Sequence, residues 1–600
     1  MENKYLILMV ALYVLPYIYY VSVSHGLGHK AEYLQLRRFL PCAILAVLPV
    51  ALANVSLISP LFLTSFITGL AWITIYPLFY YLTYHKTSSD FGFHLDTVFG
   101  LYIISWLVSL KLLVQYFNFW PAISLFIISC IEFIIILIPI IQILYYAVYK
   151  TCVTDSSIML MRETDHNEAI EFYKSLPFII QIIIPVILIA VFSAINYGNQ
   201  TTLPQISSIY DYSIYIIIAT TLFLTYYLWN TKKGVFIRTG IIELFLDVNK
   251  YIKETHLYAS NLKTRLKNLK VTPNKPNFDK PSTIIMIIGE SESRDYMSAF
   301  TDYQYNTTPW LKEMSLTKNF VLFPNSYACK DQTVPALERV LTEVNQYNDK
   351  KFYESCSIID ITKKAGYKTY WFSNQGHIGS AETAITLVAN TADKAEWTKQ
   401  NLNKPQYDET LLDYIKTVNP DENNFIVLHL MGNHFNFINR YPQNFAKFSK
   451  PNNYDLIPNY LDSIAYTDYV LQTITEYAKT NLNLQALLYF SDHATIPDKR
   501  RSPNFAGFGT VRIPMFLYLS DEYIAKNSEI YTDICNNSNK YFTNDLIYEF
   551  ICGILNIKSN HYDETNSIAS SKYKYTKEML KTNLGELWIK DDNKNILKVY

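Results

Sequence analysis

Long apolar runs, confined to the first part of the chain, constrain most strongly what this sequence can fold into. Up to about Trp229 they reach roughly 20 residues with few charges, the length that a helix needs to cross the hydrocarbon of a membrane. We count seven such runs, near residues 5–23, 39–57, 61–84, 98–117, 119–148, 176–194 and 212–229. Tyr and Trp gather at their ends, as expected for side chains at lipid headgroups. We therefore expect residues 1–230 to form a multi-pass bundle of transmembrane helices.

The charges between these runs do not agree with a simple topology. If the N-terminus is cytoplasmic, six basic residues lie on the outer side, namely Lys30, Arg37, Arg38, Lys86, Lys232 and Lys233. This conflicts with the tendency of Lys and Arg to remain on the cytoplasmic side. Either one apolar run does not span the membrane, or helix packing overrides the charge bias, so the number of spans is open by one or two.

After residue 230 the pattern becomes that of a soluble domain. Residues 231–280 are charged, helical in pattern and end in a Pro-rich stretch, which indicates a bridging helix and a linker. Residues 281–600 then alternate amphipathic helical stretches with short, nearly continuous apolar runs, at 283–288, 368–372, 425–430, 486–490 and 513–519. Such runs are typical of strands buried on both faces, so we expect an α/β domain with a mainly parallel central sheet.

Charge and cysteine content narrow the functional class only slightly. Lys plus Arg equals Asp plus Glu, at 52 each, so no basic excess favours nucleic acid as a partner. Four cysteines fall in the soluble part: Cys329, Cys356, Cys535 and Cys552. Their even number is compatible with two disulfides in an oxidising compartment, and equally with four buried thiols.

Polar residues that can do chemistry follow directly after four of the predicted strands. They are Glu290, Asn374, His434 and the pair Asp492–His493. Because the carboxyl ends of parallel strands share one edge of a sheet, we expect these residues to meet there. Glu290, Asp492 and His493 offer the oxygen and nitrogen ligands that zinc accepts, and a buried Glu290 needs a compensating cation. The alternative for the Asp–His pair is a loop cap beside a surface histidine.

Thr333 is the candidate for both a fourth ligand and a nucleophile. It stands two residues before Pro335 and opens an amphipathic helix, whose N-terminus favours anions. Bound zinc lowers the pKa of a hydroxyl and makes an alkoxide available near neutral pH. The alternative is that Thr333 serves only as the N-cap of its helix.

Six segments, taken in order along the chain, carry a more specific signal. They are IIGESESR at 287–294, NTTP at 306–309, TVPALERVLT at 333–342, AGYKTYWFSNQ at 365–375, VLHLMGNH at 427–434 and YFSDH at 489–493. This order resembles the catalytic domain of the lipid A and core phosphoethanolamine transferases, in the alkaline-phosphatase and sulfatase superfamily. The similarity covers about residues 281–580 and is greatest to the branch that decorates lipopolysaccharide core sugars.

The resemblance assigns roles to residues at matching positions. It implies that the zinc ligands are Glu290, Thr333, Asp492 and His493, with Thr333 also taking up the phosphoethanolamine group. It makes His434 a phosphate contact or a ligand of a second metal, and Asn374 a further substrate-site residue. The segment around Thr164, Asn167 and Glu168 resembles the loop in which side chains of the family contact the donor headgroup; the alternative there is an ordinary capped surface helix.

One departure from the family pattern concerns the metal count. Family members commonly have Gly-Glu after the Asp–His pair and a further histidine beyond, whereas here Ala494 and Thr495 follow and the next histidine is His561. One zinc site is therefore expected, and a complete second site is in doubt. The residues offered in place of that histidine are Asp498, Lys499 and Arg500.

The resemblance implies a multi-pass enzyme of the bacterial inner membrane with its catalytic domain in the periplasm. The expected reaction moves phosphoethanolamine from phosphatidylethanolamine to a lipid A or lipopolysaccharide core acceptor, through a zinc-activated phosphothreonine. Its partners are then membrane lipids and a lipid-linked glycan, not nucleic acid. Two alternatives stay open: a phosphoglycerol transferase or sulfatase-type hydrolase on the same fold, and a catalytically silent membrane scaffold, which only the missing histidine supports.

Overall fold

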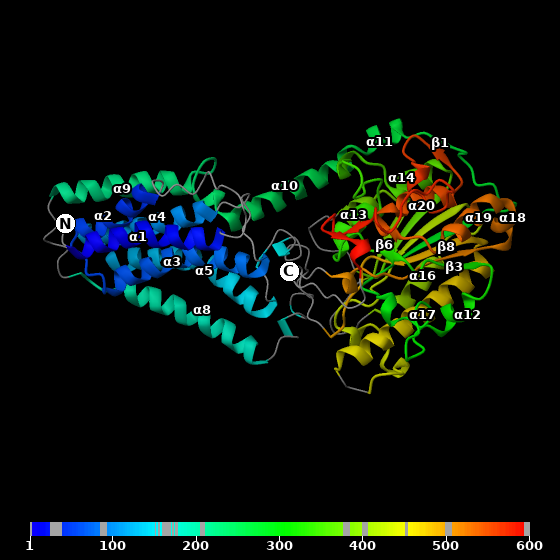
Figure 1. Ribbon diagram of the computed structural model, residues 1–600, viewed down its shortest axis with the longest axis horizontal. Helices are drawn as coiled ribbons and strands as arrows, with labels where there is room; N and C mark the ends of the chain where they lie inside the picture. Colours follow the sequence, from blue (N-terminus) through cyan, green and yellow to red (C-terminus); the bar gives the residue numbers. More distant parts are fainter. Residues whose placement is uncertain are drawn as a thin grey trace. The chain divides into compact units, whose positions relative to one another are not determined.

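The computed structural model divides into two compact units, joined by the chain near residue 250 (Figure 1). It describes residues 3–24, 39–84, 93–149, 152–153, 157–158, 170, 173–174, 178–203, 211–375, 384–398, 406–450, 454–498 and 507–592. The first unit holds the described residues up to Asn249 and the second those from Lys250 onward.

All seven apolar runs form helices in the first unit. These are α1 (Asn3–Ser24), α2 (Phe39–Leu52), α3 (Pro60–Tyr84), α4 (Phe93–Phe117), α5 (Pro121–Tyr149), α8 (Phe178–Asn199) and α9 (Asp211–Trp229). Over the described residues, five of them, α3, α4, α5, α8 and α9, are long and apolar enough to cross a membrane. The apolar stretches of α1 and α2 are shorter. Five spans by this measure lie within the range that the sequence left open, one or two fewer than the seven runs. Helix α2 ends before the predicted Leu57 because the chain turns at Asn54, whose φ is +50°.

A buried polar network joins four of these helices. Lys111 of α4 forms an ion pair with Glu132 of α5 at 2.8 Å, and neither side chain is exposed. Lys111 also donates to Ser65 Oγ of α3 at 2.6 Å, and Asn199 Nδ2 of α8 donates to Glu132 Oε2 at 2.8 Å. Two opposite charges that are paired and hydrogen-bonded tolerate an apolar surrounding, so the network fixes the register of α3, α4, α5 and α8.

The second unit is built around a seven-stranded sheet with the order β3-β9-β8-β2-β7-β5-β6. Strands β8, β2, β7, β5 and β6 are parallel, and β9 is antiparallel to both β8 and β3. The bounds are β2 (Thr283–Gly289), β3 (Phe320–Leu322), β5 (Lys368–Ser373), β6 (Lys394–Trp397), β7 (Asn424–His429), β8 (Leu484–Ser491) and β9 (Met515–Leu519). The predicted mainly parallel sheet is confirmed. The two edge strands, β3 and β6, were absent from the prediction because they are only 3 and 4 residues long.

Helices cover both faces of this sheet (Figure 1). One face packs against α13 (Thr333–Val340), α14 (Ile358–Lys364), α15 (Ala384–Ala389) and α20 (Ile547–Ile554), and the other against α12 (Pro309–Met314), α16 (Leu411–Ile415) and α17 (Leu456–Asn481). Alternate residues of β2 point to opposite faces: Met286 and Ile288 join the first core, Ile285 and Ile287 the second. This two-sided burial explains why the strand sequences are apolar throughout.

The remaining elements lie outside the sheet. Helix α10 (Gly240–Ser260) and α11 (Leu262–Asn268) precede it, and α18 (Asp521–Lys526) and α19 (Ser528–Asn537) follow β9. Short strands form three separate pairs: β1 (Val271–Thr272) with β11 (Lys558–Ser559), β4 (Ser326–Tyr327) with β10 (Phe542–Thr543), and β12 (Lys581–Thr582) with β13 (Leu587–Trp588). No disulfide links any of the seven cysteines, so of the two alternatives for the soluble domain the structure has thiols, with Cys535 only partly buried.

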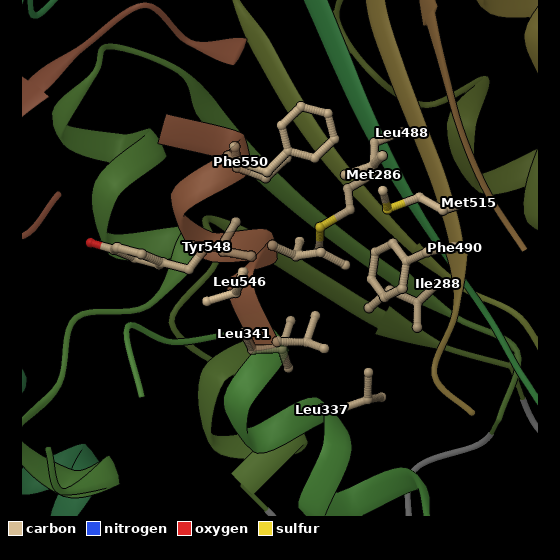
Figure 2. Close-up of a cluster of buried hydrophobic side chains, with 14 of the residues drawn as sticks. Met286, Ile288, Leu337, Leu341, Leu488, Phe490, Met515, Leu546, Tyr548 and Phe550 are labelled. Atoms are coloured by element: carbon tan, nitrogen blue, oxygen red, sulfur yellow. The ribbon is translucent and has the colours of Figure 1, made fainter. Parts of the chain in front are cut away.

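Helix α13 is held against the sheet by its apolar side. Figure 2 shows Leu337 of this helix and Leu341, which caps it, in the same cluster as Met286 and Ile288 of β2 and Phe490 of β8. All five side chains are fully buried. Burying a leucine of this kind contributes about 2 kcal/mol. The packing therefore anchors the helix whose first residue is Thr333.

Candidate functional site

The carboxyl ends of four parallel strands meet at one edge of the sheet. After β2, the Glu290 carboxylate accepts a hydrogen bond from Gln375 Nε2, which follows β5, at 3.1 Å. The Glu290 carbonyl accepts from Asn433 N, after β7, at 2.9 Å. Asp492, after β8, receives a hydrogen bond on Oδ1 from Ser291 N at 3.0 Å. Segments from four parts of the sequence thus surround Glu290, as the parallel sheet predicts.

Glu290, Asp492 and His493 form a compact group of metal-ligating side chains. Their ligand atoms all lie within 4.8 Å of one another, and all three residues are buried. His493 Nε2 lies 3.4 Å from Glu290 Oε1 and 3.5 Å from Asp492 Oδ2. The other ring nitrogen, Nδ1, lies 3.0 Å from the Ala494 carbonyl, so a proton there leaves the Nε2 lone pair facing the carboxylates.

The donor atoms of this group fit a divalent cation. Among the described residues, Asp492 Oδ2 is buried and has no hydrogen-bond partner, while Oδ1 accepts from Ser291 N and His493 N. Burial, reinforced by the neighbouring charge of Glu290, raises the pKa of Asp492 above its usual range. Two buried carboxylates and a neutral imidazole nitrogen around one point are stable as a set when a cation neutralises them.

The Thr333 hydroxyl lies against this group. Its Oγ1 lies 3.1 Å from Glu290 Oε2 and 3.4 Å from His493 Nε2. The N-cap of α13 is Gln332, and Thr333 is the first helical residue. The structure therefore does not support the alternative in which Thr333 is only an N-cap. Its hydroxyl instead faces the carboxylate group, at a helix end whose backbone dipole favours an anion.

Asn374 and His434 lie at the same edge but outside the group of ligands. Asn374 Nδ2 donates to Asp408 Oδ1 at 2.8 Å, and Asp408 Oδ2 in turn accepts from Gly432 N at 2.8 Å. Gly432 has a φ of +49°, and a Cβ there would lie 2.8 Å from Glu290 N. Asn374 thus supports the loop that leads to the half-buried His434, and the substrate-binding roles of both residues stay predictions.

Three residues at the site received no role from the sequence, although Ser291 and Gln375 directly follow predicted strands. Gln375 donates to Glu290 and, at 2.9 Å, to the Leu430 carbonyl. Ser291, with a φ of +58°, donates from Oγ to Glu290 Oε1 at 2.6 Å. His429 ends β7, and burial lowers its pKa to about 4 although Glu290 opposes this. Their position directly at strand ends was the available signal, but their residue types alone match no metal or catalytic pattern.

Several predicted residues fall outside the described part of the chain. Thr164, Asn167 and Glu168 of the donor-headgroup segment lie there, and so do Lys499 and Arg500. Asp498 is described and does not belong to the group formed by Glu290, Asp492 and His493.

Comparison with known proteins identifies the relatives of this chain. Residues 282–551 match the family model described as Sulfatase. The phosphoethanolamine transferase CptA of Salmonella typhimurium is 26% identical over 480 residues, which cover 72% of this chain and 80% of that protein. The phosphoethanolamine transferase EptC of Escherichia coli K12 is 26% identical over 474 residues, with the same coverage. The chain is a relative of the phosphoethanolamine transferases. The resemblance drawn from six sequence segments is confirmed.

A solved structure shows the same two-part architecture. The integral membrane lipooligosaccharide phosphoethanolamine transferase A of Neisseria meningitidis matches with a TM-score of 0.53 and 16% identity, over 88% of this chain and 98% of that one. At this identity the comparison establishes the fold. An N-terminal helical bundle followed by a sulfatase-like α/β domain is therefore the architecture of this relative of the phosphoethanolamine transferases.

Proposed function

We propose that this protein transfers phosphoethanolamine from phosphatidylethanolamine to a lipid A or lipopolysaccharide core acceptor, with Thr333 as the residue that carries the group between them. One observation carries the proposal: the Thr333 hydroxyl, at the N-terminus of α13, lies against the buried Glu290–Asp492–His493 group. The group lies within residues 282–551, which match the Sulfatase family model, and the relatives named above cover 72% of the chain.

Zinc is the proposed cofactor of this group. Glu290, Asp492 and His493 would hold it together with Thr333 Oγ1, and the unpartnered Oδ2 of Asp492 supplies a ligand position among the described residues. When bound there, zinc lowers the pKa of the threonine hydroxyl and offsets the charge of the phosphoryl oxygens. We propose one zinc at this edge, because the sequence has no histidine between His493 and His561, where the one expected for a second site would lie.

The proposed reaction has two substitutions at phosphorus. Thr333 Oγ1 forms a bond to the phosphorus of phosphatidylethanolamine as its proton leaves, and the bond to the diacylglycerol oxygen breaks, so that protonated diacylglycerol departs. An acceptor oxygen then forms a bond to the same phosphorus as its proton leaves, the bond to Thr333 breaks, and Thr333 Oγ1 takes up a proton to restore the hydroxyl. The backbone N–H groups at the start of α13 stabilise the anionic oxygens in both steps.

The membrane bundle supports this choice of substrates. Donor and acceptor are both lipid-anchored, and confinement in one membrane raises their effective concentration at the site. We place the chain in the bacterial inner membrane, with residues 281–600 in the periplasm, residues 231–280 as the connection and residues 1–230 as the membrane part. We also propose that Thr164, Asn167 and Glu168 contact the donor headgroup, and that His434 contacts the phosphate.

The headgroup is tested by offering two donors. Purified full-length protein in detergent is given phosphatidylethanolamine and phosphatidylglycerol together with zinc, and the diacylglycerol formed from each is measured. We expect diacylglycerol from phosphatidylethanolamine with the wild type and with Thr333→Ser, which keeps a hydroxyl, and none with Thr333→Ala. A preference for phosphatidylglycerol would reassign the chain as a phosphoglycerol transferase. Absence of both turnover and zinc would favour a silent scaffold.

A further inference from the structure

A second group of metal-ligating side chains lies away from the strand edge. Glu343 follows α13, Cys356 precedes α14, and His561 follows β11. One ligand atom from each lies within 4.8 Å of the others. The group shares no residue with Glu290, Asp492 and His493, so the proposed reaction does not use it.

The backbone fixes two of these three residues relative to each other. Thr342 and Ser357 form an isolated antiparallel bridge, and beside it Glu343 N donates to the Cys356 carbonyl at 3.1 Å. Cys356 N donates in return to Glu343 Oε1 at 2.8 Å. The thiol and the carboxylate therefore project from two paired segments, and the pairing holds them in place without any metal.

His561 approaches the carboxylate from a distant part of the chain. Its Nδ1 lies 2.8 Å from Glu343 Oε1. The side chains of Glu343 and His561 are 2% and 23% exposed, and Cys356 is buried. The group is thus closed on the side of the thiol and open to solvent on the side of the imidazole, which gives an ion a path of entry.

The ligand types match a thiophilic divalent cation. A thiolate, an imidazole and a carboxylate form a zinc ligand set, with bonds of about 2.3 Å to sulfur and 2.0–2.2 Å to nitrogen and oxygen. In a tetrahedral site the nitrogen and oxygen ligands then stand about 3.3 Å apart, so His561 and Glu343 need to separate by only about half an ångström. A partly exposed ammonium, that of Lys350, contacts the other oxygen of Glu343, Oε2, and leaves Oε1 on the side of the histidine.

We propose that Glu343, Cys356 and His561 bind a second zinc ion, with water in the fourth position on the exposed side of His561. This ion ties the segment after β11 to the turn between α13 and α14. In a chain whose seven cysteines form no disulfide, it provides the cross-link that a disulfide provides in many small extracellular domains. The site is structural and independent of the proposed transferase chemistry.

Cobalt substitution tests this site separately from the strand edge, because only this group contains a thiol. Full-length protein in detergent is stripped with a chelator and titrated with Co²⁺, and the near-ultraviolet thiolate-to-cobalt charge-transfer band is recorded. We expect the band in the wild type, in His493→Gln and in the control Cys535→Ser, and its loss in Cys356→Ser. His561→Gln, at a partly exposed position, should weaken Co²⁺ binding, and His561→Cys should restore it with a stronger band.

The zinc content per chain tests independently how many zinc sites the protein has. After loading with Zn²⁺ and removal of excess ion, we expect two zinc ions per chain in the wild type, one in His561→Gln, one in His493→Gln and none in the double variant. Absence of a charge-transfer band from the wild type, or a band that persists in Cys356→Ser, would overturn the proposal. So would equal zinc content in the wild type and His561→Gln. If His493→Gln lost zinc and His561→Gln did not, the strand-edge site would be supported and the site at Glu343, Cys356 and His561 would be rejected.

Discussion

Thr333 Oγ1 donates a hydrogen bond to Glu290 Oε2 at 3.1 Å, which joins the first residue of α13 to the residue that follows β2. This contact depends on the apolar side of α13, whose Leu337 packs into the core against the sheet. The same helix end directs backbone N–H groups toward the site. The nucleophile, a candidate zinc ligand and an anion-binding helix terminus are therefore held together by the packing of one short helix.

Gln375 is predicted to orient Glu290 for metal binding. Its amide donates to Glu290 Oε2 and to the Leu430 carbonyl, so it locks the carboxylate in one rotamer. Because residues that position metal ligands typically account for about 10–100-fold in affinity, Gln375→Ala should weaken zinc binding at the strand edge by that factor. Competition titration with a zinc indicator measures it. Gln472→Ala, which loses only a surface contact to Glu476, is the matched control and should bind as the wild type does.

His434 is predicted to act on the phosphate and not on the metal. It is half-buried in the loop after β7 and lies outside the group formed by Glu290, Asp492 and His493. His434→Ala should lower the rate of transfer by about 10²-fold, the typical effect of removing one donor to a developing charge. Zinc content measured on the same sample should be unchanged. A loss of one zinc per chain would instead make His434 a metal ligand.

Asp468 makes the stability of the soluble domain depend on pH. It accepts hydrogen bonds from Trp310 N and Leu311 N at the start of α12, yet burial raises its pKa from 3.8 to about 7 in spite of these bonds and of Lys447. Between these two values the folded protein holds more protons than the unfolded chain. The free energy of unfolding contributed by this group therefore falls as pH rises from about 4 to about 7, and stays low above that range.

The comparison of Asp468→Asn with the wild type isolates this effect. The amide cannot ionise. The apparent melting temperature of zinc-loaded Asp468→Asn should therefore decline less than that of the wild type between about pH 5 and about pH 8. Asp413→Asn, at a side chain that is 75% exposed, serves as the control and should follow the wild type. Identical pH dependence in Asp468→Asn and the wild type would contradict the assignment.

Removing one charge of the buried Lys111–Glu132 pair is predicted to destabilise the membrane bundle more than removing both charges. Lys111→Met leaves the Glu132 carboxylate buried beside Asn199, and Glu132→Gln leaves the Lys111 ammonium unpaired. Each single change should destabilise the bundle by about 3–5 kcal/mol, because it leaves one uncompensated charge. The double variant should lose less than either single one. Thermal unfolding in detergent measures all three, and additive losses would show that the pair has no coupling.

The sequence predicted the architecture where physical patterns are strong. Continuous apolar runs identified the membrane helices and the buried strands such as 283–288, because both must exclude polar groups. The short edge strand Lys394–Trp397 is half-exposed along its length and carries no such pattern. The end of α2 was placed too late, since the turn at Asn54 lies within an apolar stretch and has only a local cause.

At the site, residue type and strand position predicted part of the arrangement. Glu290, Asp492 and His493 are recognisable because charged residues directly after buried strands need a partner. Gln375 and Ser291 act only through the direction of their side chains, and for Ser291 through a left-handed backbone, which a sequence pattern does not encode. Asn374 has the residue type expected of a substrate contact, yet its amide is bound to Asp408 and to Thr398.

The most direct test of the account is the intact mass of the protein after incubation with phosphatidylethanolamine and zinc. Without an acceptor, the second substitution cannot occur, so the group should remain on the threonine. We expect a single phosphoethanolamine adduct on the wild type, localised to Thr333 by peptide mapping, and none on Thr333→Ala. No adduct on the wild type, or an adduct that persists on Thr333→Ala, would contradict the account.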